Sequence, residues 1–231
     1  MNIPKHLAQF QATGEREGEL VAQFEIGNYK NFVYLILDWA QRKAAMIDPQ
    51  HDLSMPLGCL KRHQFELSAI LLTHTHFDHV AGLPYLAKNY SQVPIYVQKD
   101  DLHRLNSQVM NQGKVRLVQD GEKIQVGEVP IQVLHTPGHS AGEVCYLTET
   151  DPPYLFTGDT LFIRDCGRTD LESGDTAQMF RSLQRLKKLS SDTIILPGHH
   201  YQSECSSTLA QELLTSPPLL CNSREELEAI P

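Results

Sequence analysis

Short apolar runs separated by turn residues make up the first part of the chain. Three of these runs lie at residues 20–26, 32–37 and 44–47. The first ends at Gly27-Asn28 and the third at Asp48-Pro49, and both pairs are typical turn sequences. The pattern therefore predicts three neighbouring strands in a largely antiparallel meander.

The rest of the chain alternates between strand-like and helix-like patterns. Further strands are predicted at residues 68–72, 93–97, 115–118, 123–126, 129–134, 143–147, 154–157 and 193–196. Helices are predicted at residues 53–65, 80–90, 175–189, 204–214 and 223–229, and residues 100–113 are helical or irregular. Pro94 favours a place near the edge of a sheet for its strand. Helices outside two β layers are the natural packing of these elements.

We expect one domain over residues 1–231, because the chain shows no linker and no low-complexity segment. Residues 1–18 are polar and are interpreted as an N-terminal arm. Residues 201–231 are interpreted as a short helical C-terminal tail.

A dense group of metal-ligand residue types follows one apolar run. His74, His76, Asp78 and His79 come directly after the strand at residues 68–72 and before a predicted helix. A tight loop between a strand and a helix lets such side chains converge on one point. Imidazole is the commonest metal ligand in proteins, and carboxylate joins it on zinc or iron.

Three further ligand-type residues repeat one local pattern. His139, Asp159 and His199 each follow a predicted strand, and each is directly preceded by glycine. Glycine lets the backbone turn sharply and approach a ligand closely. A single histidine after a strand is more often a capping or core residue, but the repetition of the pattern favours a metal centre.

The number of candidate ligands predicts two metal ions. The candidates are His74, His76, Asp78, His79, His139, Asp159 and His199. One zinc ion takes three or four protein ligands, so seven fit a two-metal site with Asp159 as the bridge. We assign His74, His76 and His139 to one metal, and Asp78, His79 and His199 to the other. A hydroxide between the metals is then the expected nucleophile. The remaining His135 and His200 are interpreted as hydrogen-bonding loop residues.

Composition and charge limit the partners and the compartment. The chain has 231 residues, 41% hydrophobic and 21% charged, with a formal net charge of −8. Such an acidic balance argues against nucleic-acid and anionic-membrane partners. Five cysteines without paired spacing argue against a disulfide framework. Without an apolar leader or a long apolar span, a cytoplasmic location is expected. A homodimer is compatible with the sequence.

The constellation from the His-x-His-x-Asp-His stretch to His199 resembles the metallo-β-lactamase superfamily, over about residues 20–200. The resemblance implies an α/β fold of the αββα sandwich type, with two mixed β-sheets flanked by helices and a dinuclear site at one edge. Asp48 matches the aspartate that supports the site in this family, although a turn residue would also suit that position.

Within the superfamily, the chain is most similar to glyoxalase II-type thioesterases and persulfide dioxygenases. The similarity lies in Gly158–Ile163 followed by Cys166-Gly167-Arg168. It implies that Arg168 and Tyr201 contact the substrate. An ion pair with a nearby acid is the alternative role for Arg168. Cys166 is either a packed small residue or a redox-sensitive thiol.

The resemblance leaves two activities open. The preferred hypothesis is a hydroxyacylglutathione hydrolase with two divalent ions, zinc before iron or manganese, in which Asp78 is both a ligand and a catalytic residue. Its substrate would be a small-molecule thioester or glutathione conjugate. The alternative is a mononuclear iron persulfide dioxygenase that uses His74, His139 and Asp159. Only about 30 residues follow His199, so we do not expect the glutathione contacts that the helical C-terminal domain supplies in full-length glyoxalase II enzymes.

Overall fold

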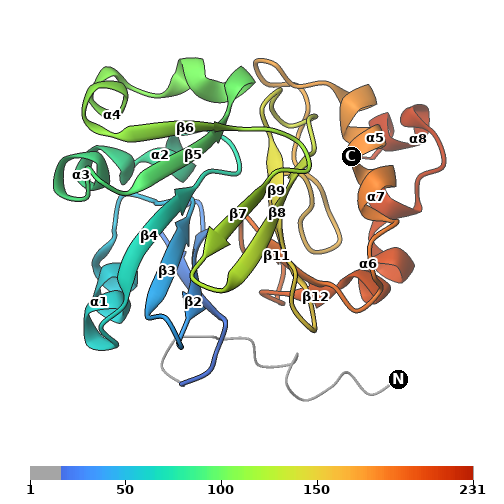
Figure 1. The fold of residues 1–231 in the computed structure, drawn as a ribbon. Helices are drawn as coiled ribbons and strands as arrows, with labels where there is room; N and C mark the ends of the chain where they lie inside the picture. Colours follow the sequence, from blue (N-terminus) through green and yellow to red (C-terminus); the bar gives the residue numbers. More distant parts are fainter. Residues whose placement is uncertain (1–16, 231) are drawn as a thin grey trace.

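The computed structural model describes residues 17–230, so nearly all of the predicted N-terminal arm lies outside the described residues. Two six-stranded sheets face each other, with helices on both outer sides (Figure 1). The first sheet contains, in spatial order, β1 (Val21–Ile26), β2 (Asn31–Asp38), β3 (Lys43–Ile47), β4 (Glu66–Leu71), β5 (Pro94–Gln98) and β6 (Lys114–Val118). The second contains β7 (Lys123–Val126), β8 (Val129–His135), β9 (Val144–Thr148), β10 (Tyr154–Gly158), β11 (Ile194–Pro197) and β12 (Ser207–Thr208), also in spatial order.

Both sheets are mixed, as predicted. β1, β2 and β3 form the expected antiparallel meander, and β3 to β6 are parallel neighbours. In the second sheet, β7 to β10 are antiparallel neighbours, β10 pairs with β11 in parallel, and β12 is antiparallel to β11. Pro94 is the first residue of β5, one strand in from the edge strand β6, where its missing N–H is tolerated.

The helices lie on the two outer faces. They are α1 (Ser54–Arg62), α2 (Phe77–Val80), α3 (Leu83–Asn89), the 3₁₀ helix η1 (Lys99–Arg104), α4 (Ser107–Gln112), α5 (Thr176–Leu186), α6 (Leu209–Thr215), α7 (Pro217–Leu220) and α8 (Arg224–Glu228). Figure 1 shows α1, α3 and α4 beside the first sheet and α5 to α8 beside the second. Within residues 17–230, no helix has both the length and the apolar character needed to cross a membrane.

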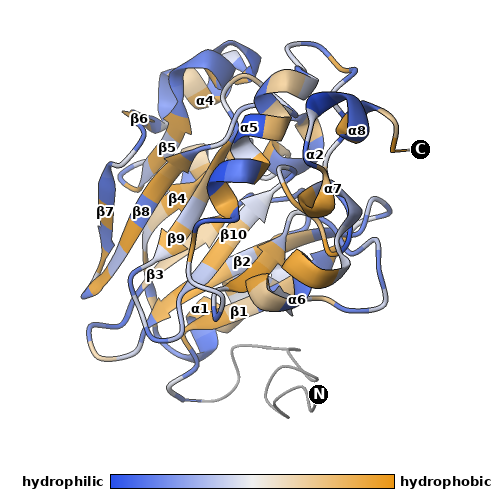
Figure 2. Cartoon of the chain, turned by 90° about the vertical axis from the view of Figure 1, so that its right-hand side faces the viewer, coloured by the Kyte–Doolittle hydropathy of each residue, from blue (hydrophilic) through white to orange (hydrophobic). Residues whose placement is uncertain are grey.

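The continuous apolar run of β2 arises because both of its faces are buried. Phe32, Tyr34 and Ile36 belong to the core between the sheets, whereas Val33 and Leu35 belong to the core under α1 and α3. A strand that is covered on both sides loses the alternation of apolar and polar residues. A third core joins the second sheet to α5 to α8. Figure 2 shows the strands mainly in the hydrophobic colour, with hydrophilic segments on the outer helices.

The predicted helices all have somewhat different limits in the structure; the helix predicted at 53–65, for example, ends at Arg62. The helix predicted at 80–90 is mainly α3, and its first residue, Val80, is the last residue of the separate helix α2. Gly82 lies between them, where a Cβ atom would lie 2.5 Å from the Gln50 carbonyl oxygen. The predicted helix 204–214 begins only at Leu209, because Thr208 pairs with Ile194 in the sheet and caps α6 by accepting from the Gln211 N–H. The predicted helix 175–189 ends at Leu186.

Candidate metal centre

His74 and His76 lie on the loop between β4 and α2, as predicted, whereas Asp78 and His79 lie within α2, which begins earlier than expected, at Phe77. Asp48 holds this segment in place. The Asp48 carboxylate accepts from the Thr73 N–H at 2.8 Å and from the Thr73 hydroxyl at 2.5 Å. The same carboxylate lies 3.0 Å from Nδ1 of His79. Asp48 therefore joins the end of β3 to both ends of the cluster, which is more than a residue of a turn alone would do.

The other ligand-type residues lie at the ends of strands of the second sheet. His139 follows β8, Asp159 follows β10 and His199 follows β11. Gly158 has a φ of +48°, and a Cβ atom there would lie 2.5 Å from the Thr73 hydroxyl oxygen. This close approach of the two sheets brings Asp159 next to the first cluster.

The structure brings six of the seven candidate ligands together in two groups of three. His74, His76 and His139 form one group, in which the ligand atoms lie within 4.8 Å of one another. Asp78, His79 and His199 form the other by the same measure. Nδ1 of His76 and Nε2 of His139 are 2.8 Å apart, and the Nε2 atoms of His79 and His199 are 3.1 Å apart.

Asp159 lies between the two groups. Its Oδ2 atom is 3.5 Å from Nε2 of His139 and 3.4 Å from Nε2 of His199. Its Oδ1 atom is 3.5 Å from Nε2 of His79. One carboxylate thus reaches both groups, which is the arrangement that a bridging ligand requires.

Hydrogen bonds behind the imidazoles direct their Nε2 atoms toward the centre. Nδ1 of His139 lies 2.8 Å from the Arg168 carbonyl oxygen, and Nδ1 of His199 lies 2.8 Å from the Tyr29 carbonyl oxygen. Because these oxygens only accept, each Nδ1 carries the proton and each Nε2 presents a lone pair. This is the usual way in which proteins orient histidine ligands of metals.

Burial and neighbouring charges shift the pKa values of the site residues in opposite directions. Burial lowers the pKa of His74 well below its usual value and, together with His139, lowers the pKa of His76 to about 4. Burial alone would lower the pKa of His79, but Asp159, Asp48 and Asp78 raise it to about 9. Burial opposes ionisation of Asp159, yet His79 and His199 hold its pKa well below the usual range. Neutral imidazoles and an ionised carboxylate are the forms that bind cations.

The donor set fits metal ions. Among the described residues, Nε2 of His74 and Oδ1 of Asp159 are buried and have no hydrogen-bond partner. Such orphaned atoms are rare in folded proteins. In each group an Nε2 atom with a lone pair, that of His139 or of His199, faces a second imidazole nitrogen at 2.8 or 3.1 Å, and a cation can take the place of the proton between them. The residues therefore form groups able to bind metal ions.

Sequence reasoning missed two buried polar residues of this site. Asn31 donates to Oδ2 of Asp78 at 2.9 Å, and its own side-chain oxygen accepts from Gln50 at 3.0 Å. Glu143 accepts from the Asp159 N–H at 2.9 Å. Asn31 begins an apolar strand and Glu143 precedes one, so neither has a local pattern that indicates a site.

The two predicted substrate residues lie at the surface. Arg168 forms a two-pronged ion pair with Asp170, at 2.6 and 2.7 Å, and both side chains are exposed. An ion pair with a nearby acid was the alternative role given for Arg168, and Asp170 is that acid. Tyr201 stacks on His199.

His135 and His200 bond outside the two groups. Nε2 of His135 lies 2.9 Å from the Ala141 carbonyl oxygen, and Nδ1 of His200 lies 2.5 Å from the Glu25 carboxylate. Both residues therefore have the loop hydrogen-bonding role that was expected of them.

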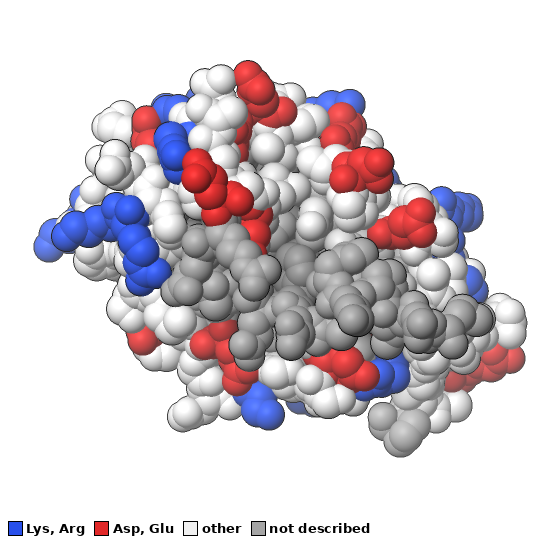
Figure 3. All heavy atoms as spheres, turned by 90° about the horizontal axis from the view of Figure 1, so that it is seen from below, with Lys and Arg blue, Asp and Glu red and all other residues white. Residues whose placement is uncertain are grey.

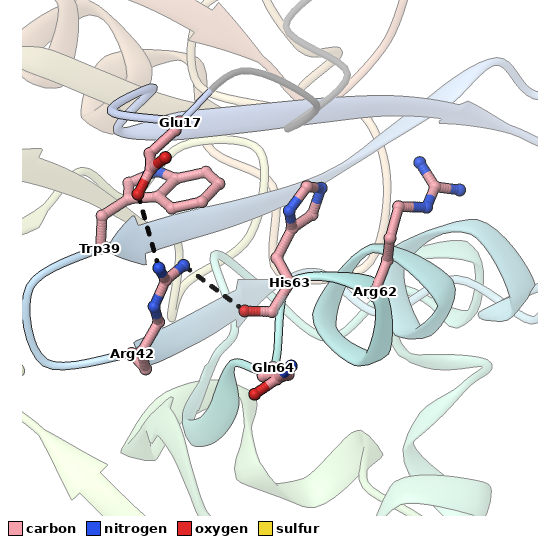
Figure 4. A pocket seen from close by; sticks show the side chains of 6 residues that line it. All are labelled: Glu17, Trp39, Arg42, Arg62, His63 and Gln64. Carbon is pink, nitrogen blue, oxygen red and sulfur yellow. Dashed lines mark hydrogen bonds and ion pairs between the residues drawn. The ribbon is translucent and has the colours of Figure 1, made fainter.

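Two hollows differ in their relation to the site. One, of about 440 Å³, lies beside the first ligand loop and is lined mainly by apolar residues, with His76 and Arg104 among them. The other, of about 400 Å³, is lined by Glu17, Trp39, Arg42, Arg62, His63 and Gln64 (Figure 4). None of the seven candidate ligands lines the second hollow.

Figure 3 shows acidic and basic side chains interspersed on the face seen from below.

This architecture and this ligand arrangement define the class of protein. The chain belongs to the metallo-beta-lactamase superfamily, whose family model matches residues 27–199. The match confirms both the expected αββα fold and the family resemblance.

Particular relatives carry more specific names. The chain is 34% identical over 209 residues to a probable hydroxyacylglutathione hydrolase of Schizosaccharomyces pombe, covering 87% of this chain and 77% of that protein. It is 34% identical over 171 residues to the hydroxyacylglutathione hydrolase of Yersinia enterocolitica, covering 74% of this chain and 62% of that protein. ETHE1 from Myxococcus xanthus has a similar structure, with a TM-score of 0.80 and 29% identity over 92% of both chains.

Proposed function

We propose that this protein is a metal-dependent thioesterase that hydrolyses a hydroxyacylglutathione, with two divalent ions and zinc as the preferred metal. One observation carries the proposal: two groups of three ligand-type residues lie on either side of Asp159, which reaches both. Two relatives that are named hydroxyacylglutathione hydrolases support the choice of substrate class.

The residues divide the work in the following way. His74, His76 and His139 would hold one ion, Asp78, His79 and His199 the other, and Asp159 both. Two bound divalent ions supply Lewis acidity and lower the pKa of water toward about 7. Asn31 orients the Asp78 carboxylate from behind through a hydrogen bond of 2.9 Å. Asp78, itself one of the ligands of the second group, would also orient the attacking water.

The exposed residues around this centre would bind the glutathione part. The planar guanidinium of Arg168 suits a carboxylate. It donates two hydrogen bonds to the Asp170 carboxylate, and it would bind a glutathione carboxylate in the same geometry. Binding would exchange Asp170 for a glutathione carboxylate. Tyr201 lies on the exposed side of His199, where it would contact the same ligand.

A mononuclear iron dioxygenase acting on glutathione persulfide is the second candidate. Cys166-Gly167-Arg168 is common to both branches and does not separate them, and the structural similarity to ETHE1 from Myxococcus xanthus supports this second candidate. His74, His139 and Asp159 would form its two-histidine, one-carboxylate triad. Nε2 of His139 lies 3.5 Å from Asp159, and the rings of His74 and His139 are 5.1 Å apart.

Metal counting in an Asp78→Ala variant separates the two candidates. The thioesterase is expected to bind about two ions per chain and to hydrolyse S-lactoylglutathione, and Asp78→Ala should lose one ion and most of the activity. Asp192→Ala removes an exposed turn carboxylate and is the matched control. An unchanged single ferrous ion in Asp78→Ala, with oxygen uptake on glutathione persulfide and no thioester cleavage, would overturn the proposal in favour of the dioxygenase.

A further inference from the structure

Asp101 in η1 is a fully buried carboxylate with a complete set of partners. Its Oδ1 atom accepts from the Gly142 N–H at 2.9 Å and from Arg104 at 3.2 Å. Its Oδ2 atom accepts from the Ser140 hydroxyl at 2.8 Å and from the Thr75 N–H at 3.2 Å. The Thr75 hydroxyl also donates to the Asp101 backbone carbonyl oxygen at 2.8 Å.

These partners belong to the two loops that carry His76 and His139. Thr75 directly precedes His76, and Ser140 directly follows His139. We propose that Asp101 is a positioning residue that sets the approach of these two histidines, which lie 2.8 Å apart. This inference rests on the metal centre of the proposed function. The hydrogen bonds of the Asp101 carboxylate go to Thr75, Arg104, Ser140 and Gly142 and to neither imidazole, so it would act through the loops alone.

The packing around Asp101 leaves little freedom for another arrangement. A Cβ atom on Gly142 would lie 2.7 Å from the Asp101 backbone nitrogen, so the loop after His139 can approach this closely only with glycine. Arg104 supplies the positive charge and also donates to the Glu172 carbonyl oxygen and the Ser173 hydroxyl, both at 3.0 Å.

An amide cannot replace this carboxylate. Each carboxylate oxygen accepts from two donors, one of which is a backbone N–H. An asparagine at position 101 would turn its NH₂ group toward one of these N–H groups. Asp101→Asn therefore keeps the size of the side chain but loses the hydrogen bond from the backbone N–H of one of the two loops.

The control is a carboxylate of the same kind far from the ligands. Asp38 is also buried, and it accepts from the N–H groups of Ala40, Gln41 and Glu128. Asp38→Asn should lower stability by the loss of backbone contacts without disturbing either ligand loop. Comparison of the two variants separates positioning of the ligands from general stability.

The experiment measures zinc affinity by chelator competition, well below the unfolding temperature of each variant. Asp101→Asn is expected to weaken zinc binding by about 10-fold to 100-fold, while Asp38→Asn keeps the wild-type affinity. Equal affinities in wild type and Asp101→Asn overturn the inference, as does an equal loss in both variants. If Asp101→Asn does not unfold cooperatively, Ser140→Ala takes its place, and wild-type affinity in that variant has the same consequence.

The outcome is independent of the substrate. A wild-type protein that binds zinc but leaves thioesters intact contradicts the proposed function, while the zinc affinities of the variants still decide the role of Asp101. A protein with thioesterase activity and unchanged zinc affinity in Asp101→Asn contradicts only the inference about Asp101.

Discussion

The phenol ring of Tyr201 stacks on the imidazole of His199, with ring centroids 4.8 Å apart and ring planes inclined by only 8°. Phe162 meets both rings edge-on. His199 is buried, whereas 51% of the Tyr201 surface is exposed. The tyrosine thus covers one face of a candidate metal ligand and presents its other face to the outside.

Two substitutions of Tyr201 separate its ring from its hydroxyl. Burial, followed by Asp159 and Asp78, raises the pKa of Tyr201 to about 12, so the phenol is neutral near pH 7 and can donate a hydrogen bond. We expect Tyr201→Phe to raise KM for S-lactoylglutathione by about 2-fold to 10-fold. Tyr201→Ala should raise it further by a similar factor, because the ring contact is also lost. Steady-state kinetics and metal content check this, and a fall in metal content would instead indicate a role in holding His199.

Arg168 should contribute to binding rather than to stability. An exposed ion pair such as Arg168–Asp170 stabilises a protein by roughly 0–1 kcal/mol, so Arg168→Ala should hardly change the melting temperature. Loss of a charged hydrogen bond to the glutathione carboxylate should lower kcat/KM by about 10-fold to 150-fold. Asp170→Ala, which frees the guanidinium, is the control and should not lower kcat/KM. Equal kinetics in wild type and Arg168→Ala would show that the ion pair is the whole role of Arg168.

Local sequence patterns predicted the strands other than β12 and the candidate ligands that gather at one place, but not the contacts that orient these side chains. The cluster from His74 to His79 could be recognised because an apolar strand precedes it and its ligand types are dense. Asp101 and Asn31 could not, because their partners lie 26 to 41 and 47 residues away. Such contacts depend on how two sheets meet, which no local spacing records.

Element ends were also hard to predict where one residue serves two elements. Thr208 is the last residue of β12 and the cap of α6. Its strand pairing depends on Ile194, which is distant in sequence. A helical pattern over residues 204–214 therefore extended too far toward the N-terminus.

Cys166 should behave as a packed residue, the first of its two predicted roles. Burial, followed by Asp165, raises the pKa of its thiol to about 12, and Cys166 packs against the core beside α5. Because the pKa is raised, little of the thiol is in its reactive thiolate form at neutral pH, and this ionised fraction increases only as the pH rises toward 12. At pH 8 only about 1 thiol in 10,000 is ionised, compared with about one in four for an ordinary cysteine. Mass-spectrometric mapping after iodoacetamide treatment should find Cys166 labelled far more slowly in the folded than in the unfolded protein, and rapid labelling at pH 7 would support the redox-sensitive role.

Removal of metal should destabilise the fold, because an ion that binds only the folded arrangement of ligands adds its binding free energy to the stability of the folded state. At a zinc concentration of about 100 times Kd, binding contributes about 2.7 kcal/mol per site. For a domain of this size, each kcal/mol shifts Tm by about 2–4 °C, so chelation should lower Tm by at least about 5 °C. Differential scanning calorimetry with and without added zinc measures this shift.

The Asn31→Ala substitution should weaken the binding of only one of the two metal ions. Asn31 contacts Asp78 at 2.9 Å and Nε2 of His79 at 3.3 Å, both in the second group, and its third side-chain hydrogen bond goes to Gln50 rather than to the first group. We therefore expect the variant to bind the second ion about 10-fold to 100-fold more weakly while it keeps the first. A calorimetric titration of Asn31→Ala with zinc should show two separate affinities. The same weakening at both sites would contradict the division into two groups, since it would show that the seven ligands respond to Asn31 as one unit.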